Sequence, residues 1–287
     1  MPELPEVETI ARGLHKRVAG DAIASVWLGS KPQTMKSRPA EIAATLEHTR
    51  ITQVRRMGKH IVFDLERNGA AQTSAPGKGR KRPVVLGPRS QWIVHLGMTG
   101  RMVVCEPAAE IVKHTHAIVT LVSGRELRFV DPRRFGRLSV AGKGGFDAGG
   151  EEPLEVDKER FLLLFRGRKT PIKSALLNQK LLRGVGNIYA DESLFRARLR
   201  PRRHVSTLTR AQLEGLYRSV QEVLKEAIAL GGSSISDYVD ADGEEGFFQL
   251  QHRVYGREGK PCLVCKTPIK RVVIVGRSSH YCPKCQK

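Results

Sequence analysis

The first residues of the chain, MPELPEVETI, bring together groups that could do chemistry. If Met1 is removed, Pro2 becomes a secondary amine at the chain terminus. An ordinary α-amino group has a pKa of about 7.7–8.0, so part of it is a nucleophile near neutral pH. Glu3 could act beside it as a general acid, and Glu6 could orient the reacting groups. The pattern alone favours a simpler interpretation, in which these prolines and acids start a helix.

A second reactive group lies near the C-terminus, where four cysteines follow a C-x2-C-x16-C-x2-C pattern: Cys262, Cys265, Cys282 and Cys285. This spacing is typical of a tetrathiolate zinc site. A redox dithiol and an iron–sulfur cluster are the alternatives. Four thiolates leave no open coordination position, so we expect one structural Zn²⁺ that holds a short basic hairpin in shape.

The charge of the chain indicates a polyanionic partner. Its 49 Lys and Arg exceed its 29 Asp and Glu, which gives a net charge of +20. Residues 253–287, around the cysteine cluster, carry nine of these basic residues and a single acid, Glu258. Nucleic acid is favoured over an anionic membrane or ribosomal packing. No apolar run approaches the length of a membrane span, so we expect a soluble, cytoplasmic protein that does not bind membranes. We also expect it to be a monomer.

The elements that must position these groups fall into two patterns. Apolar residues at helical spacing predict a helix over 5–18, and six β-branched runs after it predict a β-sandwich. The runs are Ile23–Leu28, Ile51–Arg55, Ile61–Leu65, Trp92–Leu96, Ile118–Val122 and Glu126–Val130. A basic, Gly- and Pro-rich stretch at 67–90 interrupts them and predicts a loop.

Beyond a glycine-rich boundary near 141–150 the pattern becomes helical. The predicted helices are Thr170–Leu181, Asn187–Leu199 and Thr209–Leu230, the last with a capping box of Thr209 and Gln212. A hairpin strand is expected at Arg271–Val275. The fold class is therefore α+β and multidomain. The predicted ranges are 2–140 for the sandwich with its flanking helices, 141–160 for a linker, 161–248 for a helical domain and 249–287 for a zinc finger.

Five separated motifs occur in one order along the chain: PELPEVET, HLGMTGRM at 95–102, DPRRFGR at 131–137, GVGNIYADESLF at 184–195 and the four-cysteine finger. This set resembles the formamidopyrimidine-DNA glycosylases. The resemblance spans essentially the whole chain. It implies a DNA glycosylase and AP lyase that excises 8-oxoguanine and formamidopyrimidines from duplex DNA and then cuts the abasic site by β,δ-elimination. It also implies that the segment with Gly184 and Gly186 is a helix–two-turn–helix element.

The resemblance assigns roles residue by residue. Pro2 would form the Schiff base, Glu3 would be the general acid, Glu6 would orient the amine or the sugar, and Lys59 would lie near the lesion phosphate. Met98, Arg133 and Phe135 would fill the gap left by an everted base, although Met98 and Phe135 could instead be core residues. The remaining expected DNA contacts are His95, Arg134, Lys173, Asn187 and Arg277. Asn187 could instead be a pure helix cap.

Two other functions remain open at this point. An endonuclease VIII-type enzyme would share the finger and the terminal proline but would prefer oxidised pyrimidines. A zinc-ribbon protein that only binds DNA would share the charge and the finger but would leave the first residues unexplained. The stretch at 231–248 resembles the segment that covers an everted 8-oxoguanine in the family, and the stretch at 67–90 is longer than the family pattern.

Overall fold

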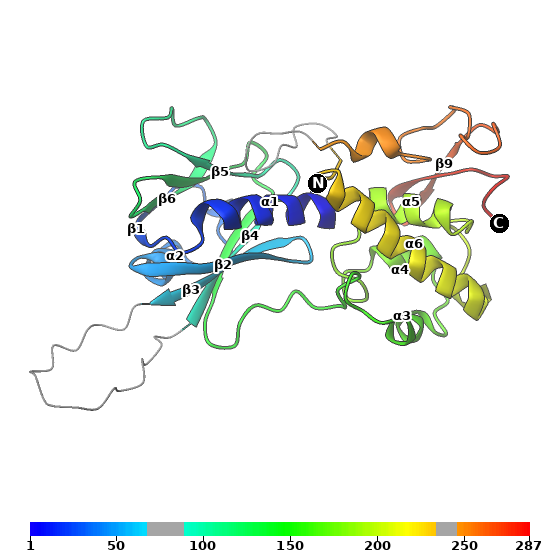
Figure 1. Cartoon of the computed structure of the whole chain (residues 1–287), viewed down its shortest axis with the longest axis horizontal. Coiled ribbons are helices and arrows are strands. Elements are labelled where there is room, and N and C mark those ends of the chain that lie inside the picture. Colours follow the sequence, from blue (N-terminus) through cyan, green and yellow to red (C-terminus); the bar gives the residue numbers. More distant parts are fainter. Residues whose placement is uncertain (68–88, 234–245) are drawn as a thin grey trace, which may run out of the picture.

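The computed structural model describes residues 1–67, 89–233 and 246–287 (Figure 1). The predicted loop at 67–90 and the predicted lesion-covering segment at 231–248 lie mostly outside these ranges. The described chain forms two bodies, a β-sandwich and a helical part that carries the C-terminal hairpin, and the segment 142–157 connects them. Within the described ranges, no helix is long and apolar enough to cross a membrane.

Helix α1, Leu4–Val18, begins at the helical part and runs from there along the sandwich (Figure 1). The apolar stripe predicted for 5–18 is buried, and Pro5 lies in the first turn, where its missing N–H costs nothing. Val7 and the apolar residues after it pack into the core of the sandwich, whereas Leu4 packs into the core of the helical part. The first turn of α1 therefore lies at the junction of the two bodies.

Two four-stranded antiparallel sheets form the sandwich, which confirms that prediction. One sheet has the order β2–β3–β4–β8 and the other β1–β6–β7–β5. The strands are β1 Ile23–Leu28, β2 Thr49–Met57, β3 His60–Arg67, β4 Arg89–His95, β5 Arg101–Cys105, β6 Thr115–Leu121, β7 Glu126–Val130 and β8 Arg137–Ala141. Strands β5 and β8 were not predicted, and both are short and lie at a sheet edge. Helix α2, Pro39–Leu46, and the 3₁₀ turn η1, Pro32–Thr34, complete the sandwich.

The helical part contains α3 Lys158–Phe165, α4 Ile172–Leu177, α5 Asn187–Arg196 and α6 Arg210–Ala229, with 3₁₀ turns η2 Val205–Thr207 and η3 Phe248–Gln251. The capping box of Thr209 and Gln212 is present at the start of α6. Helix α4 is shorter than predicted because the side chain of Asn178 accepts a hydrogen bond from the backbone N–H of Lys180 and turns the chain. Helix α5 ends early because Arg198 adopts a left-handed conformation, with φ of 57°.

Two buried acids of α5 fasten the C-terminal hairpin, β9 Lys270–Ile274 and β10 Arg277–Tyr281, and the segment 253–255 before it. Asp191 accepts a hydrogen bond from the backbone N–H of His280 at 2.8 Å. Glu192 accepts three backbone hydrogen bonds from residues 253–255. Buried carboxylates with this many donors are well satisfied, so the hairpin has a fixed position relative to α5.

Candidate functional site

A cleft of about 1100 Å³ opens between the sandwich and the helical part. It brings together nine of the twelve noncysteine residues predicted for the site: Pro2, Glu3, Glu6, Lys59, His95, Met98, Arg133, Asn187 and Arg277. They come from the first turn of α1, the β2–β3 turn, two sandwich loops, the start of α5 and the hairpin. Segments far apart in the sequence therefore meet around the chain terminus. Arg134, Phe135 and Lys173 do not line this cleft.

Glu3 lies at the floor of the cleft with 4% of its surface exposed. Its carboxylate accepts hydrogen bonds from the backbone N–H groups of Ile188 at 3.2 Å and Tyr189 at 3.5 Å, in the first turn of α5. Burial raises the pKa of Glu3 to about 7, although nearby Lys59 opposes this change. A carboxyl group with this pKa can be a proton donor at neutral pH.

The glycines before α5 make room for the first turn of α1. A Cβ atom on Gly186 would lie 2.1 Å from the carboxyl carbon of Glu3, and one on Gly184 would lie 2.9 Å from the side chain of Leu4. The backbone N–H of Leu4 donates to the carbonyl of Gly184 at 3.1 Å. Glycine at these two positions therefore leaves room for the side chains of Glu3 and Leu4 against the start of α5.

Glu6 is also buried, and three donors converge on its carboxylate. They are the backbone N–H of Glu3 at 2.8 Å, the backbone N–H of Ser233 at 2.8 Å and the hydroxyl of Tyr189. Burial raises the pKa of Glu6. Tyr189 and Ser233 were not singled out from the sequence. No spacing in the sequence pairs either of them with Glu6, because 183 and 227 residues of chain separate them.

Three basic residues line the cleft near the two acids. Burial lowers the pKa of Lys59, with Glu3 opposing the change and Arg277 adding to it. The ammonium of Lys59 is therefore attracted by the carboxylate of Glu3 and repelled by the guanidinium of Arg277 on the hairpin. Burial also lowers the pKa of His95 to about 4, so this side chain is a neutral imidazole near pH 7. Its Nδ1 accepts a hydrogen bond from the N–H of Gly97 at 3.1 Å, which leaves Nε2–H as a donor.

Two loops of the sandwich carry the residues predicted to fill the gap that an everted base leaves in the duplex. The side chains of Met98 and Phe135 are 44% and 48% exposed, so they are not core residues. Arg133 stacks over the ring of Phe135 at 4.9 Å, and Arg134 is exposed beside them. Asp131 joins the loops, since it accepts from the Thr99 hydroxyl at 2.6 Å and from the Gly136 N–H at 2.8 Å.

One predicted DNA contact, Lys173, and one alternative interpretation, that of Asn187, need correction. Lys173 is fully buried and pairs with Asp191 at 2.6 Å, so direct contact of its ammonium with DNA does not fit this structure. It also donates to the carbonyl of Ser278 at 2.6 Å and thereby supports the hairpin next to Arg277. Asn187 is the first residue of α5 and not its cap, because the N-cap position belongs to Gly186. The interpretation of Asn187 as a pure cap is therefore wrong.

Comparisons with known proteins agree with this arrangement. Residues 1–138 match the model for the formamidopyrimidine-DNA glycosylase N-terminal domain, 150–239 match its H2TH domain, and 259–287 match a zinc finger found in FPG and IleRS. The chain belongs to the formamidopyrimidine-DNA glycosylase family. A glycosylase of this name from Solibacter usitatus is 44% identical over the full length of both chains.

Solved structures of family members have the same fold. The MutM (Fpg) protein of Thermus thermophilus is 40% identical, with a TM-score of 0.82 over 99% of this chain and 98% of that one. A complex between a Lactococcus lactis Fpg mutant and Fapy-dG containing DNA is 30% identical, with a TM-score of 0.85 over all of both chains. The formamidopyrimidine-DNA glycosylase family thus accounts for the whole chain, and this protein is a DNA glycosylase of base excision repair.

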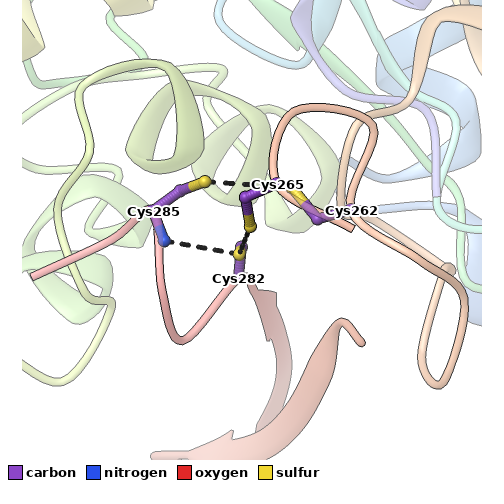
Figure 2. Close-up of side chains that lie close together, drawn as sticks. All are labelled: Cys262, Cys265, Cys282 and Cys285. Carbon is purple, nitrogen blue, oxygen red and sulfur yellow. Dashed lines mark hydrogen bonds between the residues drawn. The ribbon is translucent and has the colours of Figure 1, made fainter. Parts of the chain in front are cut away.

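The family's zinc finger coincides with the predicted cysteine cluster. All four sulfurs lie within 4.8 Å of one another, with Cys265 and Cys282 at 3.4 Å and Cys262 and Cys285 at 3.9 Å (Figure 2). Tetrahedral coordination with Zn–S bonds of about 2.3 Å requires sulfurs roughly 3.8 Å apart. The four cysteines therefore provide a site for one structural zinc ion at the base of the hairpin.

Removal of the metal is expected to loosen the hairpin that carries Arg277. We expect a strong chelator to lower the thermal midpoint and to weaken duplex binding by at least about tenfold, because a finger this small has little core of its own. Thermal unfolding and fluorescence anisotropy measure the two effects, and readdition of zinc should restore both. Cys105→Ser is the control, since Cys105 lies in β5. Full retention of both properties by a metal-free protein would contradict this assignment.

Proposed function

We propose that the chain is a bifunctional glycosylase and AP lyase that removes 8-oxoguanine and formamidopyrimidines from duplex DNA. The observation that carries this proposal is the position of Glu3, which is buried beside the chain terminus on the N-terminus of α5, with its pKa near 7. A nucleophile and an acid then lie on the floor of one cleft. That arrangement suits attack on a sugar carbon together with protonation of a sugar oxygen.

In the proposed reaction, removal of Met1 exposes the secondary amine of Pro2. Burial lowers the pKa of the terminal amino group, here that of Met1, below its ordinary 8.0. We expect burial to act in the same way on the amine of Pro2, with Glu3 and Glu6 opposing it, so that more of the amine is unprotonated at neutral pH than in an exposed terminus. The nitrogen bonds to C1′ as the bond from C1′ to the damaged base breaks, and the proton that the amine loses goes to the departing base. Glu3 gives its proton to the sugar ring oxygen, and the ring opens to an iminium.

The iminium then allows strand cleavage. It withdraws electrons from C2′, so a proton leaves C2′ and the 3′ phosphate departs in β-elimination. A second elimination releases the 5′ phosphate. Proline favours this course because its amine has a single proton to lose. Once the iminium has formed, the nitrogen has no proton left, so the adduct cannot relax to a neutral imine.

The basic and exposed residues of the cleft are proposed to hold the DNA. Lys59, His95, Asn187 and Arg277 would bind phosphates beside the everted nucleotide, and Arg134 would bind one at the loop tip. Met98, Arg133 and Phe135 would enter the gap in the duplex and offset the cost of unstacking, a few kcal/mol. Arg133 would hydrogen-bond the unpaired cytosine.

Duplex DNA containing oxidised purines or abasic sites is the proposed partner. The net charge of +20 supports a DNA partner, as does the Lactococcus lactis complex with Fapy-dG containing DNA. We also propose that the protein acts as a cytoplasmic monomer, that Glu6 orients the sugar, and that the domains are 2–140, 161–248 and 249–287 with a linker at 141–160. Helix α3 begins at Lys158, inside that linker range.

Borohydride trapping on three duplexes tests this function. We expect a covalent protein–DNA adduct and faster excision with 8-oxoguanine opposite cytosine than with thymine glycol. Faster release of thymine glycol would instead assign an endonuclease VIII-type activity. Binding to all duplexes without an adduct, including one with an abasic site, would indicate a protein that only binds DNA.

A further inference from the structure

A chain of buried polar groups leads from Glu6 away from the cleft to His252. The hydroxyl of Tyr189 donates to Glu6, and its oxygen lies 3.4 Å from Oγ of Ser233. Oγ of Ser233 in turn lies 3.1 Å from Nε2 of His252. Tyr189, Ser233 and His252 are all buried, with exposed fractions of 0%, 4% and 7%. Four polar side chains thus satisfy one another inside the protein, and water has little access to replace any of them.

Two backbone stretches hold this row of polar side chains: the one that ends at Ser233 and the one that begins at Gly246. The N–H of Phe248 donates to the carbonyl of Gly232 at 2.9 Å, and the N–H of Phe247 donates to that of Leu230 at 2.8 Å. Ser233 and Phe247 pair as an antiparallel bridge. A Cβ atom on Gly246 would lie 2.3 Å from the carbonyl oxygen of Gly232, so the two ends are in close contact. Ser233 therefore has a fixed backbone, and its N–H points at Glu6.

The ring of His252 is fixed on both sides. It lies edge-on to Phe248 at 5.6 Å and to Tyr255 at 5.6 Å, and Phe248 packs against the ring of Tyr189 at 5.5 Å. Burial lowers the pKa of His252 to about 4. The imidazole is therefore neutral near pH 7 and supplies one donor and one acceptor nitrogen. Its role is to hold the Ser233 hydroxyl and not to provide a charge.

We propose that His252 is a positioning residue for the glycosylase reaction. Through Ser233 it fixes Tyr189, and these two residues together hold the carboxylate of Glu6 against the backbone N–H of Glu3. The proposal rests on the proposed role of the first turn of α1, because the orientation of Glu3 depends on the hydrogen bond from its backbone to Glu6. Loss of the imidazole would let the side chains of Ser233 and Tyr189 rotate away from each other. The carboxylate of Glu6 would then lose the support of the Tyr189 hydroxyl.

Two substitutions separate hydrogen bonding from packing. His252→Phe keeps an aromatic ring in the slot but removes the polar atom that faces Ser233, whereas His252→Gln can place an amide nitrogen near the position of Nε2. Single-turnover excision of 8-oxoguanine should be about tenfold slower in His252→Phe, the scale of one hydrogen bond to a charged network. The rate in His252→Gln should stay within about twofold of the unmodified rate. Affinity for a duplex with a stable abasic-site analogue should not change in either variant.

The matched control is Phe161→Leu, which trims aromatic packing against Phe165 and Tyr217 in the helical part without changing any of these polar groups or the rings beside them. It should lower the thermal midpoint while the excision rate per active molecule stays near that of the unmodified protein. Equal excision rates in His252→Phe and the unmodified protein, or equally slow rates in His252→Phe and His252→Gln, would overturn the proposal and leave His252 as a packing residue.

Crystal structures of the unmodified protein and of His252→Phe test the same inference without a substrate. The hydrogen bond from the Tyr189 hydroxyl to Glu6 should be lengthened or lost in the variant, whereas the one from the fixed backbone N–H of Ser233 should remain. If the hydrogen bond from Tyr189 also remains as it is, the positioning role is excluded, whatever the enzyme's activity. Borohydride trapping by the unmodified protein tests the proposed function separately, so failure of one idea does not imply failure of the other.

Discussion

Replacement of Pro2 by leucine should abolish covalent trapping on an abasic-site duplex and slow excision of 8-oxoguanine by at least about a thousandfold. Leucine is too large for efficient removal of the preceding methionine, so the nitrogen at position 2 stays an unreactive amide. Binding of the abasic-site analogue should change little, because the expected phosphate contacts come from Lys59, Asn187 and Arg277. Mass spectrometry of the trapped adduct, followed by peptide mapping, identifies the attacking nitrogen.

Pro5→Ala is the matched control for Pro2. Pro5 lies in the first turn of α1, three residues after Pro2, and is buried, but its nitrogen is a backbone amide in any form of the chain. This variant should form the adduct at nearly the unmodified rate. A Pro2→Leu protein that is trapped as fast as the Pro5→Ala protein would show that a lysine or another amine is the nucleophile, and the proposed chemistry would be wrong.

Replacement of Glu3 by glutamine should slow base excision by about 10²- to 10⁴-fold, the usual contribution of a general acid. Glutamine fits the space beside Gly186 but cannot give up a proton. In the unmodified enzyme the Glu3 carboxyl must be protonated to act, and its pKa is about 7. The excision rate should therefore fall as the pH rises through 7, and this limb of the pH profile should be absent from Glu3→Gln.

Stability should respond to pH through the same group. The pKa of Glu3 is about 7 in the folded chain and 4.5 in the reference state, so between these pH values the folded protein holds a proton that the unfolded chain has released. The contribution of Glu3 to the free energy of unfolding thus decreases as the pH rises from about 4.5 to about 7. The difference in thermal midpoint between Glu3→Gln and the unmodified protein should grow in favour of the variant over that interval.

Glu8→Gln provides the control for both measurements. Glu8 lies on the same helix but pairs with Arg12 and Arg56, each at 2.7 Å, and these arginines lower its pKa. Its neutralisation should leave the limb near pH 7 in place. If Glu3→Gln excises the base at the unmodified rate with the same pH profile, another group supplies the proton.

Features that depend on neighbours in the sequence were predicted well. The stripe of α1, the capping box at Thr209 and the cysteine spacing each follow from a short, regular pattern, and the glycines before α5 marked a turn. The resemblance then assigned positions such as Pro2 and Met98 that no local pattern could distinguish from a helix start or a core residue. Strands β5 and β8 were missed because five residues at a sheet edge give too short an alternation to recognise.

Features that depend on tertiary contact were predicted less well. Lys173 is a basic residue in a basic chain, and nothing in its surroundings along the sequence shows that Asp191 would meet it in the interior. The same is true of Tyr189, Ser233 and His252, which come from three segments and meet only around Glu6. Burial of a polar side chain is decided by partners that the sequence does not place, so the sequence identified the acids of the site but not the residues that hold them.

Leu4 of helix α1 packs into the core of the helical part, whereas the apolar residues from Val7 onward pack into the core of the sandwich. Separation of the two bodies would break the contact of Glu3 with the start of α5 and expose its carboxyl group to water. The pKa of Glu3 would then return to that of an ordinary carboxyl group. The raised pKa of Glu3 is therefore expected to appear only when the two bodies pack together. A half expressed alone would carry either the proposed nucleophile or the end of α5 that binds Glu3, and we expect that neither half would cut DNA.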